Sequence, residues 1–259
     1  MKTKKKPSVA IVACIHGDEI AGKYVIGELK KRKDLSGDVG FFIAHPRAVA
    51  KKKRFLVQDL NRSFPGKKFG NVEEKIAYSL QQKLRYFDFV IDIHTTNSKI
   101  DKLAIVTSLS VPVRNLLKSV PIKKVALVTA RVLGGKQLGR YHRAAVSLEY
   151  GPDKSGKNYK IILGDVLVIL RNLGLISGPV KIISPKELYR VSGVYKVNKS
   201  VTPLESLRDF KLIKKGEVVG RDNKGRKVFS KKSFYPLFVG SGRYSGTLAL
   251  VSSRRNFKS

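Results

Sequence analysis

The sequence Val9-Ala10-Ile11-Val12-Ala13-Cys14-Ile15-His16-Gly17-Asp18-Glu19 joins a continuous apolar run to a short polar turn. An uninterrupted apolar run of this length is typical of a strand that is buried on both faces of a parallel sheet. After the turn, Ile20, Tyr24, Val25 and Leu29 recur at helical spacing with charged residues between them. Because the strand passes directly into a helix, the segment predicts the first β–α unit of an α/β fold.

The same alternation continues along the chain to residue 173. Predicted strands cover residues 39–44, 87–93, 103–107, 125–129 and 146–150, and predicted helices cover residues 19–31, 72–85 and 158–173. Strands that alternate with helices favour an α/β fold with a mixed, mostly parallel sheet flanked by helices.

The pattern changes after Gly174. Short β-rich pieces follow at residues 188–191, 193–197, 212–219, 227–229, 236–239 and 246–251, separated by Gly, Ser and Asp-Asn. They predict a small antiparallel β domain over residues 179–259. We expect this domain to cap the functional site of an α/β catalytic domain over residues 1–178.

Three polar side chains follow the carboxyl ends of predicted strands. His16 and Glu19 come after the first strand, and His94 follows the strand at residues 87–93. Open α/β sheets place their ligand sites at this edge. Two histidines and a glutamate are a known ligand set of catalytic zinc, in which the fourth position is left to water or substrate. The sequence therefore predicts a zinc hydrolase with one Zn²⁺ per chain, held by His16, Glu19 and His94.

The chain is strongly basic. Its 259 residues include 53 Lys and Arg against 19 Asp and Glu, a formal net charge of +34. Such a field attracts nucleic acid, anionic membrane surfaces and acidic small molecules, so charge alone does not choose among them. No apolar stretch approaches the roughly 20 residues that a membrane span needs, and we expect no membrane partner.

The cysteine content and the N-terminus bear on the compartment. Cys14 is the one cysteine, which rules out an intrachain disulfide and is compatible with a reducing compartment. Its place inside the first strand favours a small core residue over a metal ligand. The lysines of residues 1–6 imitate a secretory signal, but cleavage after the apolar run would remove His16 and Glu19. We therefore expect a cytoplasmic protein.

Between the two ligand segments lies a run rich in polar side chains, residues 54–66. With this run the chain resembles the aspartoacylase and succinylglutamate desuccinylase family, relatives of the zinc carboxypeptidases. The matching motifs are His16-Gly17-Asp18-Glu19, His45-Pro46-Arg47-Ala48-Val49, Arg54 followed by Asp59-Leu60-Asn61-Arg62, Asp92-Ile93-His94-Thr95-Thr96, and Leu148-Glu149-Tyr150-Gly151-Pro152. They stand in the family's order over roughly the first 150 residues. The resemblance implies a zinc-carboxypeptidase-like fold.

The resemblance also implies a role for each matching residue. Glu149 is expected to take a proton from water and to pass it to the leaving nitrogen. Arg54 is expected to face the oxygen that becomes negative during attack. Asn61 and Arg62 match the pair that holds the α-carboxylate of the substrate, where arginine offers a planar two-pronged donor. Asp59 matches a carboxylate that orients a metal-bound histidine, and His16 is the expected partner.

Two further substrate contacts are expected from the resemblance. The family carries an arginine about ten residues before the catalytic glutamate, which binds the side-chain carboxylate of the substrate. Here Gly139 holds that position, with Arg140 next to it and Arg143 nearby, and we expect Arg140 to take the role. Tyr244 resembles a tyrosine of the C-terminal part that lines the pocket.

The function implied by the resemblance is a zinc-dependent amidohydrolase that removes the acyl group from a small anionic N-acyl amino acid, with an acidic amino acid favoured. A zinc carboxypeptidase that acts on peptides is one alternative, and a wide entrance to the site would favour it. A nucleic-acid-binding protein on the same scaffold is another, supported by the excess of Lys and Arg. Non-specific attraction to nucleic acid is expected from the charge in any case.

Overall fold

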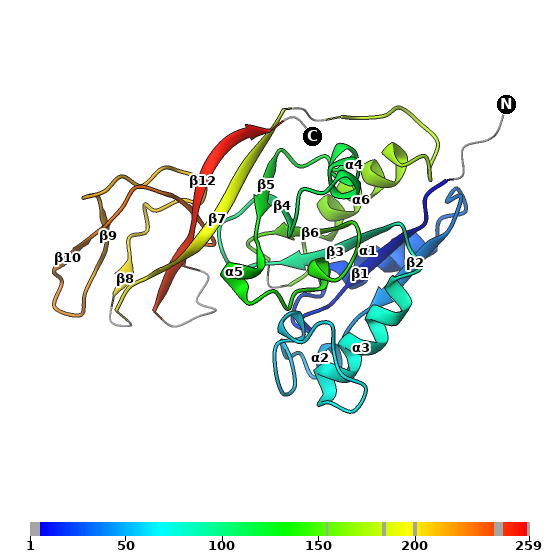
Figure 1. The fold of residues 1–259 in the computed structure, drawn as a ribbon, viewed down its shortest axis with the longest axis horizontal. Helices are drawn as coiled ribbons and strands as arrows, with labels where there is room; N and C mark the ends of the chain where they lie inside the picture. The colour runs from blue at the N-terminus through cyan, green and yellow to red at the C-terminus, as the bar shows by residue number, and fades with distance from the viewer. Residues whose placement is uncertain (1–5, 154, 183–184, 199–200, 241–245, 258–259) are drawn as a thin grey trace.

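Strand β1 (Val9–Ala13) lies near one edge of a nine-stranded mixed sheet, and β7 and β12 lie toward its other edge (Figure 1). The computed structural model describes residues 6–153, 155–182, 185–198, 201–240 and 246–257. The strand order in the sheet is β11-β12-β7-β5-β4-β6-β3-β1-β2. A separate three-stranded sheet, β10-β9-β8, is formed by the C-terminal part of the chain.

The strands of the α/β part are β1, β2 (Val39–Ile43), β3 (Phe89–Thr95), β4 (Lys102–Val106), β5 (Lys124–Leu127) and β6 (Ala145–Tyr150). The later strands are β7 (Lys186–Lys196), β8 (Thr202–Pro203), β9 (Val218–Arg221), β10 (Lys227–Phe229), β11 (Tyr235–Leu237) and β12 (Thr247–Phe257). The helices are α1 (Ala21–Lys30), α2 (Pro46–Ala50), α3 (Val72–Leu84), α4 (Val111–Ser119), α5 (Ala130–Leu133) and α6 (Tyr159–Asn172), with 3₁₀ turns η1 (Leu60–Arg62) and η2 (Leu138–Arg140). None of the described helices has the length and apolarity that crossing a bilayer requires.

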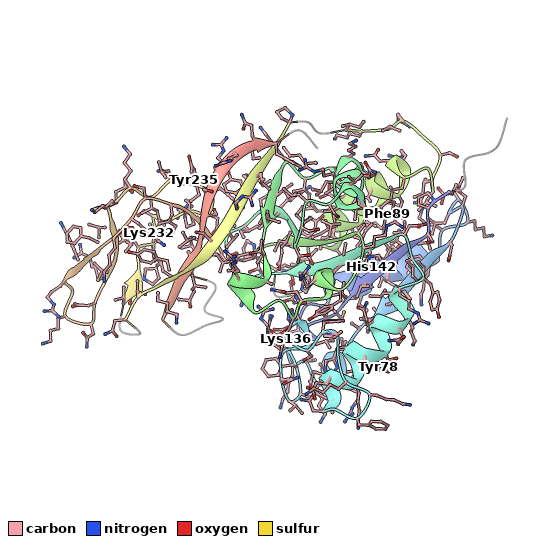
Figure 2. All side chains as sticks on the ribbon, in the orientation of Figure 1. Tyr78, Phe89, Lys136, His142, Lys232 and Tyr235 are labelled. Atoms are coloured by element: carbon pink, nitrogen blue, oxygen red, sulfur yellow. The ribbon has the colours of Figure 1, made fainter. Side chains whose placement is uncertain are left out.

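The apolar run in β1 is buried on both faces because helices cover the sheet from both sides. Val9, Ile11 and Ala13 belong to a core cluster shared with α1, α4 and α6. Ala10 and Val12 belong to a second cluster, shared with α3 on the other face. This division follows the alternation of side chains along a strand. Figure 2 shows the side chains that fill these layers, with Tyr78 on α3.

Parallel pairing brings the carboxyl ends of three central strands to one edge. β1 pairs in parallel with β3, and β3 pairs in parallel with β6. In the second ladder His94 is opposite Glu149. Neighbouring strands lie about 4.8 Å apart, so residues that follow β1, β3 and β6 meet at this edge.

The C-terminal strands continue the main sheet. β7 pairs in parallel with β5 and antiparallel with β12, which pairs in turn with β11. The predicted antiparallel β sheet is therefore present, and it shares hydrogen bonds with the α/β part. The division into residues 1–178 and 179–259 stays a prediction. Lys232 and Tyr235 mark this half of the molecule in Figure 2.

Some sequence predictions of individual elements are wrong, for local reasons. The segment predicted as a strand at residues 212–219 is irregular apart from one isolated bridge between Ile213 and Phe234, and β9 begins only at Val218. The pieces at 188–191 and 193–197 form one strand, β7, because pairing with β12 carries it past Gly193. Helices α2 and α4 were not predicted, and each begins with a proline in its first turn. Proline disrupts helix interiors but is favoured in the first turn.

Candidate metal centre and substrate cavity

The turn after β1 requires a glycine. The Gly17 amide donates a hydrogen bond to the Arg54 carbonyl at 3.0 Å. A Cβ on Gly17 would lie 2.3 Å from the carbonyl carbon of Ala48 and 2.5 Å from the oxygen of Lys53, and no side chain fits there. The missing side chain therefore lets the segment that carries Arg54 pack directly against the turn that carries His16.

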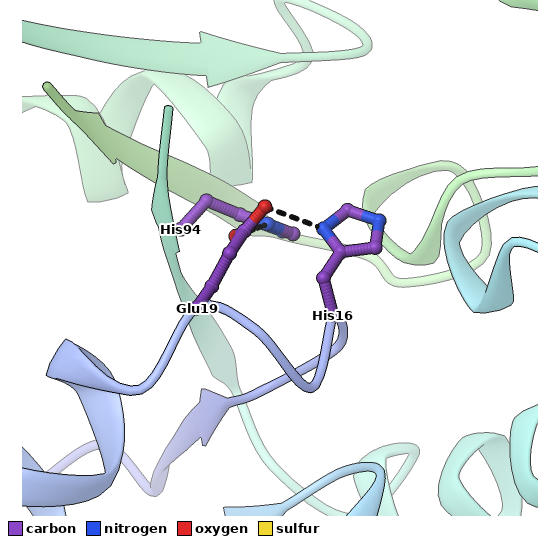
Figure 3. A group of neighbouring side chains, drawn as sticks. All are labelled: His16, Glu19 and His94. Atoms are coloured by element: carbon purple, nitrogen blue, oxygen red, sulfur yellow. Dashed lines mark hydrogen bonds and ion pairs between the residues drawn. The ribbon is translucent and has the colours of Figure 1, made fainter. Parts of the chain in front are cut away.

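His16, Glu19 and His94 converge at the edge of the sheet (Figure 3). Nδ1 of His16 lies 2.9 Å from Oε1 of Glu19, and Nδ1 of His94 lies 2.9 Å from Oε2 of the same carboxylate. One ligand atom from each residue lies within 4.8 Å of the others, and all three side chains are buried. The predicted set is thus brought together around a space that a single divalent ion can occupy.

A carboxylate holds the other nitrogen of each imidazole. Nε2 of His16 lies 3.0 Å from Oδ1 of Asp59, as the resemblance implies, and Nε2 of His94 lies 2.7 Å from Oδ2 of Asp92. These contacts fix each ring with Nδ1 toward the centre, the arrangement that metal-binding histidines use. The role of Asp92 was missed, although residues two apart on a strand share a face.

The charges of the cluster favour a cation at its centre. Burial raises the pKa of Glu19, but His16 and His94 outweigh it and hold that pKa well below its ordinary value of 4.5. Burial lowers the pKa of His94, but Asp92 and Glu19 outweigh it and hold that pKa well above 6.5. The donor types and their convergence fit a divalent metal ion.

Cys14 is not part of the cluster. Its side chain is fully buried in the core, and Sγ donates a weak hydrogen bond to the carbonyl of Glu19 at 3.6 Å. Burial raises the pKa of Cys14 to about 12, and so the group stays a thiol. This agrees with the core role expected from its place in the strand.

The side chains of Arg54 and Asp59 meet beside the cluster. The Arg54 guanidinium donates to Oε1 of Glu19 at 3.0 Å and to Oδ2 of Asp59 at 3.3 Å. Asp59 also caps η1, because its Oδ1 accepts from the Asn61 amide at 2.8 Å. This cap carries Asn61 and Arg62 to the edge of the metal centre.

A buried carboxylate anchors the segment that follows Arg54. Oε1 of Glu73, on the first turn of α3, accepts from the amides of Leu56 at 2.7 Å and Val57 at 3.1 Å. Nε2 of His45 lies 3.1 Å from the same oxygen, and both side chains are fully buried. His45, which also follows a strand, is therefore a structural residue outside the metal cluster.

A cavity of about 130 Å³ opens beside the metal cluster. Its lining includes the predicted residues His16, Arg54, Asn61, Arg62, His94 and Glu149. The other lining residues come from later strands, from η2 and from the C-terminal part: Ile105, Thr107, Val128, Gln137, Gly139, Ala145, Ser147, Phe238, Thr247 and Leu250. Glu149 is buried at 7 % exposure and stands opposite His94 in the sheet.

One predicted substrate contact is absent from the described lining of the cavity, and another falls on a residue that the structure does not describe. Arg140 is exposed and is not among the described residues of the lining, which contains Gly139 instead. Tyr244 lies outside the described residues. Gln137, Phe238 and Leu250 also line the cavity and were not predicted, because no local pattern in the sequence shows that these positions meet there.

Comparison with known proteins agrees with the motifs. Residues 5–119 match the family model of the succinylglutamate desuccinylase/aspartoacylase catalytic domain. The chain is 24 % identical over 282 residues to N-acyl-aromatic-L-amino acid amidohydrolase (carboxylate-forming) A of Danio rerio. The aligned region covers 91 % of this chain and 85 % of that protein. It is 31 % identical over 109 residues to a probable aspartoacylase of Trichodesmium erythraeum, covering 37 % of each chain.

Solved structures show the same fold. Murine aminoacylase 3 superimposes with a TM-score of 0.81 at 22 % identity, over 98 % of this chain and 97 % of that one. Succinylglutamate desuccinylase of Vibrio parahaemolyticus superimposes with a TM-score of 0.71 at 23 % identity, over 100 % of this chain and 84 % of that one.

The fold and site define a class, an α/β protein with a His-Glu-His metal cluster under a small cavity. Over residues 5–119 the chain resembles the catalytic domain of the succinylglutamate desuccinylase and aspartoacylase family, and the predicted resemblance is confirmed. The predicted mixed, mostly parallel α/β fold is confirmed as the fold of these solved structures.

Proposed function

We propose that this chain is a zinc-dependent amidohydrolase that hydrolyses N-acyl amino acids to a carboxylate and a free amino acid. The observation that carries the proposal is the convergence of His16, Glu19 and His94 at the wall of a cavity that also contains Glu149. The curated relatives that the chain matches over most of its length are named as amidohydrolases of N-acyl amino acids.

His16, Glu19 and His94 would hold one zinc ion. When bound, zinc lowers the pKa of water to about 7 and polarises a carbonyl group. Asp59 and Asp92 keep the two imidazoles turned with Nδ1 toward the ion. The protein thus supplies a prepared ligand set, with Glu19 already ionised at neutral pH because its pKa lies well below 4.5.

Glu149 is the proposed proton carrier. Its carboxylate would take a proton from the attacking water and deliver it to the amide nitrogen as the carbon–nitrogen bond breaks. The residue stands next to His94 across the sheet, is buried, and lines the cavity. This position lets one carboxylate reach both the water and the leaving group.

Arg54, Asn61 and Arg62 are the proposed anion-binding groups. The Arg54 guanidinium lies within 3.0 Å of a metal-ligand carboxylate, where it can stabilise negative charge that develops on the carbonyl oxygen. Oδ1 of Asn61 accepts from the Leu138 amide at 3.1 Å, which leaves its NH₂ group as the donor toward a substrate. With the two-pronged donor of Arg62, this NH₂ group suits the α-carboxylate.

The shape of the cavity favours a small substrate over a peptide. Phe238, Thr247 and Leu250 from the C-terminal part supply one of its walls, which fits the expected capping role. The carboxypeptidase alternative needs a groove that is open to a longer chain. The positive charge remains compatible with non-specific nucleic-acid attraction, and a cytoplasmic location stays a prediction.

The test combines metal analysis with an assay. Purified protein and the Glu149→Ala variant are each analysed for zinc and assayed with a panel that includes N-acetylaspartate, N-succinylglutamate and N-acetylphenylalanine. We expect about one zinc per chain in both proteins, and a loss of turnover of about 10²-fold or more in the variant. Failure of the zinc-loaded parent protein to hydrolyse any N-acyl amino acid would refute the proposal.

A further inference from the structure

One buried carboxylate holds both ends of a loop beside the metal cluster. The loop covers residues 45–57 and lies next to the first turn of α3 (Figure 1). At its start, Nε2 of His45 lies 3.1 Å from Oε1 of Glu73. At its end, the amides of Leu56 and Val57 donate to the same oxygen at 2.7 and 3.1 Å. Because one oxygen contacts both ends, the carboxylate fixes the base of the loop.

The contacts of Glu73 favour its charged form. Nδ1 of His45 accepts from the Ala48 amide at 3.3 Å, so a neutral ring carries its proton on Nε2 and donates it to Glu73. Three N–H groups therefore point at one carboxylate oxygen. Burial raises the pKa of Glu73, but its hydrogen bonds, first that from His45, outweigh burial and hold the pKa below its ordinary value of 4.5. The side chain is fully buried, where a charge is stable only when its hydrogen bonds are made.

Little apolar packing holds the end of the loop. Residues 54–59, all of which the structure describes, form neither helix nor strand. Phe55 is 37 % exposed and Val57 is 60 % exposed. Hydrogen bonds to a charged group are roughly twice as strong as those between neutral groups. The two amide bonds to Glu73 are therefore the main described contacts that fix this stretch against α3.

The position of the loop sets the position of Arg54. The Arg54 carbonyl accepts from the Gly17 amide at 3.0 Å. Its guanidinium donates to Oε1 of Glu19 at 3.0 Å and to Oδ2 of Asp59 at 3.3 Å. Arg54 stands only two residues before the first amide that Glu73 holds, so a shift of this stretch moves the guanidinium relative to the metal cluster. In a catalytic site, a displacement of about 1 Å can cost about 10²-fold in rate.

We infer that Glu73 is a positioning residue, which holds Arg54 at the metal cluster through the 45–57 loop. The inference rests on the proposed function, in which Arg54 stabilises negative charge on the carbonyl oxygen, and deepens it. Glu73 is not among the described residues that line the cavity. It therefore acts on the rate through Arg54 and not through contact with the substrate.

The first test measures amide hydrogen exchange in the protein with zinc added, and it does not depend on turnover. In the parent protein we expect the amides of Leu56 and Val57 to exchange at least about 100-fold more slowly than in an unfolded chain, because each donates to a buried carboxylate. Exchange at the rate of an unfolded chain would overturn the inference, whether or not any variant folds.

Two substitutions on the same turn of α3 remove the same charge. In Glu73→Gln the new NH₂ group meets no described acceptor at either position, because Oε1 faces three donors and Oε2 has no hydrogen-bond partner among the described residues. Glu74→Gln is the matched control. Glu74 accepts from the Asn71 amide at 3.0 Å in the capping box of α3, a role that glutamine also fills.

The exchange rates of the two variants should differ. We expect the amides of Leu56, Val57 and Gly17 to exchange about tenfold or more faster in Glu73→Gln, and within about twofold of the parent rate in Glu74→Gln. Amides of β3 are the internal reference, because a loss of global stability would speed their exchange as well. Unchanged exchange at all three amides in a folded Glu73→Gln variant would overturn the inference.

The second test is a kinetic cycle with Arg54→Ala, using the N-acyl amino acid that the parent protein hydrolyses best. Glu73→Gln should lower kcat about 10- to 100-fold and change KM by less than about threefold, because the lost interaction belongs to the transition state. Arg54→Ala should itself lower kcat about 10²- to 10³-fold. In that background Glu73→Gln should cost less than about threefold more, because the group that it positions is gone. Glu74→Gln should leave kcat within about twofold.

The outcomes separate the inference from the proposed function. Equal losses of kcat from Glu73→Gln in both backgrounds, or faster exchange with an unchanged kcat, would overturn the inference while hydrolysis by the parent protein still supported the amidohydrolase. If the parent protein hydrolyses no N-acyl amino acid, the function is refuted. The exchange of the Leu56, Val57 and Gly17 amides then decides by itself whether Glu73 holds the loop at the metal cluster. Zinc content and melting temperature report whether each variant is folded.

Discussion

The orientation of single side chains decides what the candidate metal centre can do. Both imidazoles present Nδ1 to Glu19 because Asp59 and Asp92 hold the opposite nitrogens at 3.0 and 2.7 Å. A carboxylate in this position also makes the imidazole a stronger donor to a metal. The candidate site therefore consists of five residues. His16, Glu19 and His94 would contact the ion, and Asp59 and Asp92 orient the two imidazole rings.

Asp92→Asn should weaken zinc binding. The variant keeps the size of the side chain and loses the negative charge that fixes the His94 ring, and we expect zinc affinity to fall about 10- to 100-fold. Competition with a chromophoric chelator measures the change. Asp38→Asn, at an exposed position, is the control and should leave the affinity unchanged. Equal affinities in the two variants would show that Asp92 does not support the metal centre.

A second single residue links pH to stability. Oδ1 of Asp209 accepts from the Val239 amide at 2.9 Å, next to Phe238, which lines the cavity in a left-handed backbone conformation with φ of 61°. Burial raises the pKa of Asp209 to about 6, against an ordinary value of 3.8, although hydrogen bonds from Val239 and Phe238 oppose the rise. The folded protein therefore holds this proton more tightly than the unfolded chain does.

Asp209→Asn should remove a pH-dependent loss of stability. Between pH 3.8 and about 6 the carboxyl of Asp209 is protonated more often in the folded protein than in the unfolded chain. The stability that the protonated carboxyl contributes therefore falls as pH rises through this window and is lost above it. Asparagine keeps the acceptor oxygen and does not ionise. We expect the variant to exceed the parent by about 1–2 kcal/mol at pH 7.5 and by less at pH 5, measured by urea unfolding. A constant difference across this range would exclude the titration of Asp209 as its cause.

At the scale of elements, α1 packs closely against the sheet directly after the turn that carries His16 and Glu19. Gly22 and Gly27 lie in the same helix but in different surroundings. A Cβ on Gly22 would lie 2.6 Å from Cβ of Ala13 and 3.2 Å from Cγ2 of Ile93, whereas a Cβ on Gly27 would meet nothing within 4 Å. The first glycine permits close approach to β1 and β3, and the second does not serve packing.

Gly22→Ala and Gly27→Ala should therefore change stability in opposite directions. Overpacking at Gly22 should cost about 1–3 kcal/mol of unfolding free energy. At Gly27 alanine should add about 0.5–1 kcal/mol, because it loses less conformational freedom on forming a helix. Denaturant unfolding of the two variants and the parent checks this, and each variant serves as the matched control of the other. Similar effects from both would contradict the packing argument.

At the scale of the whole molecule, charge and sheet continuity dominate. The chain carries a formal net charge of +34, and its long-range field acts on every anionic ligand that approaches. The same charge repels itself, which destabilises the compact state. The hydrogen bonds between β5 and β7 join the C-terminal strands to the α/β part within one sheet, and they stabilise the folded chain against this repulsion.

Added salt should stabilise the protein. Raising sodium chloride from about 0.01 M to about 0.1 M shortens the Debye length from about 30 Å to about 10 Å and screens the repulsion. We expect the melting temperature to rise by several degrees over this range, measured by calorimetry at fixed pH. An equal osmolality of sucrose controls for solvent effects other than screening. A melting temperature that is flat or falling with salt would indicate that repulsion is not a major destabilising term.

The sequence by itself determined the central strands, the main helices and the ligand triad. His16, Glu19 and His94 could be found because they stand directly after apolar runs, and parallel pairing brings the ends of such strands to one edge. Asp59 was predicted from a motif. Asp92 was not predicted, although it lies two residues before His94 on the same strand and its side chain is therefore on the same face. These features depend on a few residues that are close in sequence.

Only the tertiary structure decided which residues form the far end of the cavity. Gln137, Phe238 and Leu250 come from distant segments, and strand order and loop packing bring them to the cavity that His16 and His94 also line. The same packing leaves Arg140 exposed and Gly139 in the wall. Local periodicity describes how one segment meets the core, but a cavity is the space left between segments, and its lining depends on contacts across the whole chain.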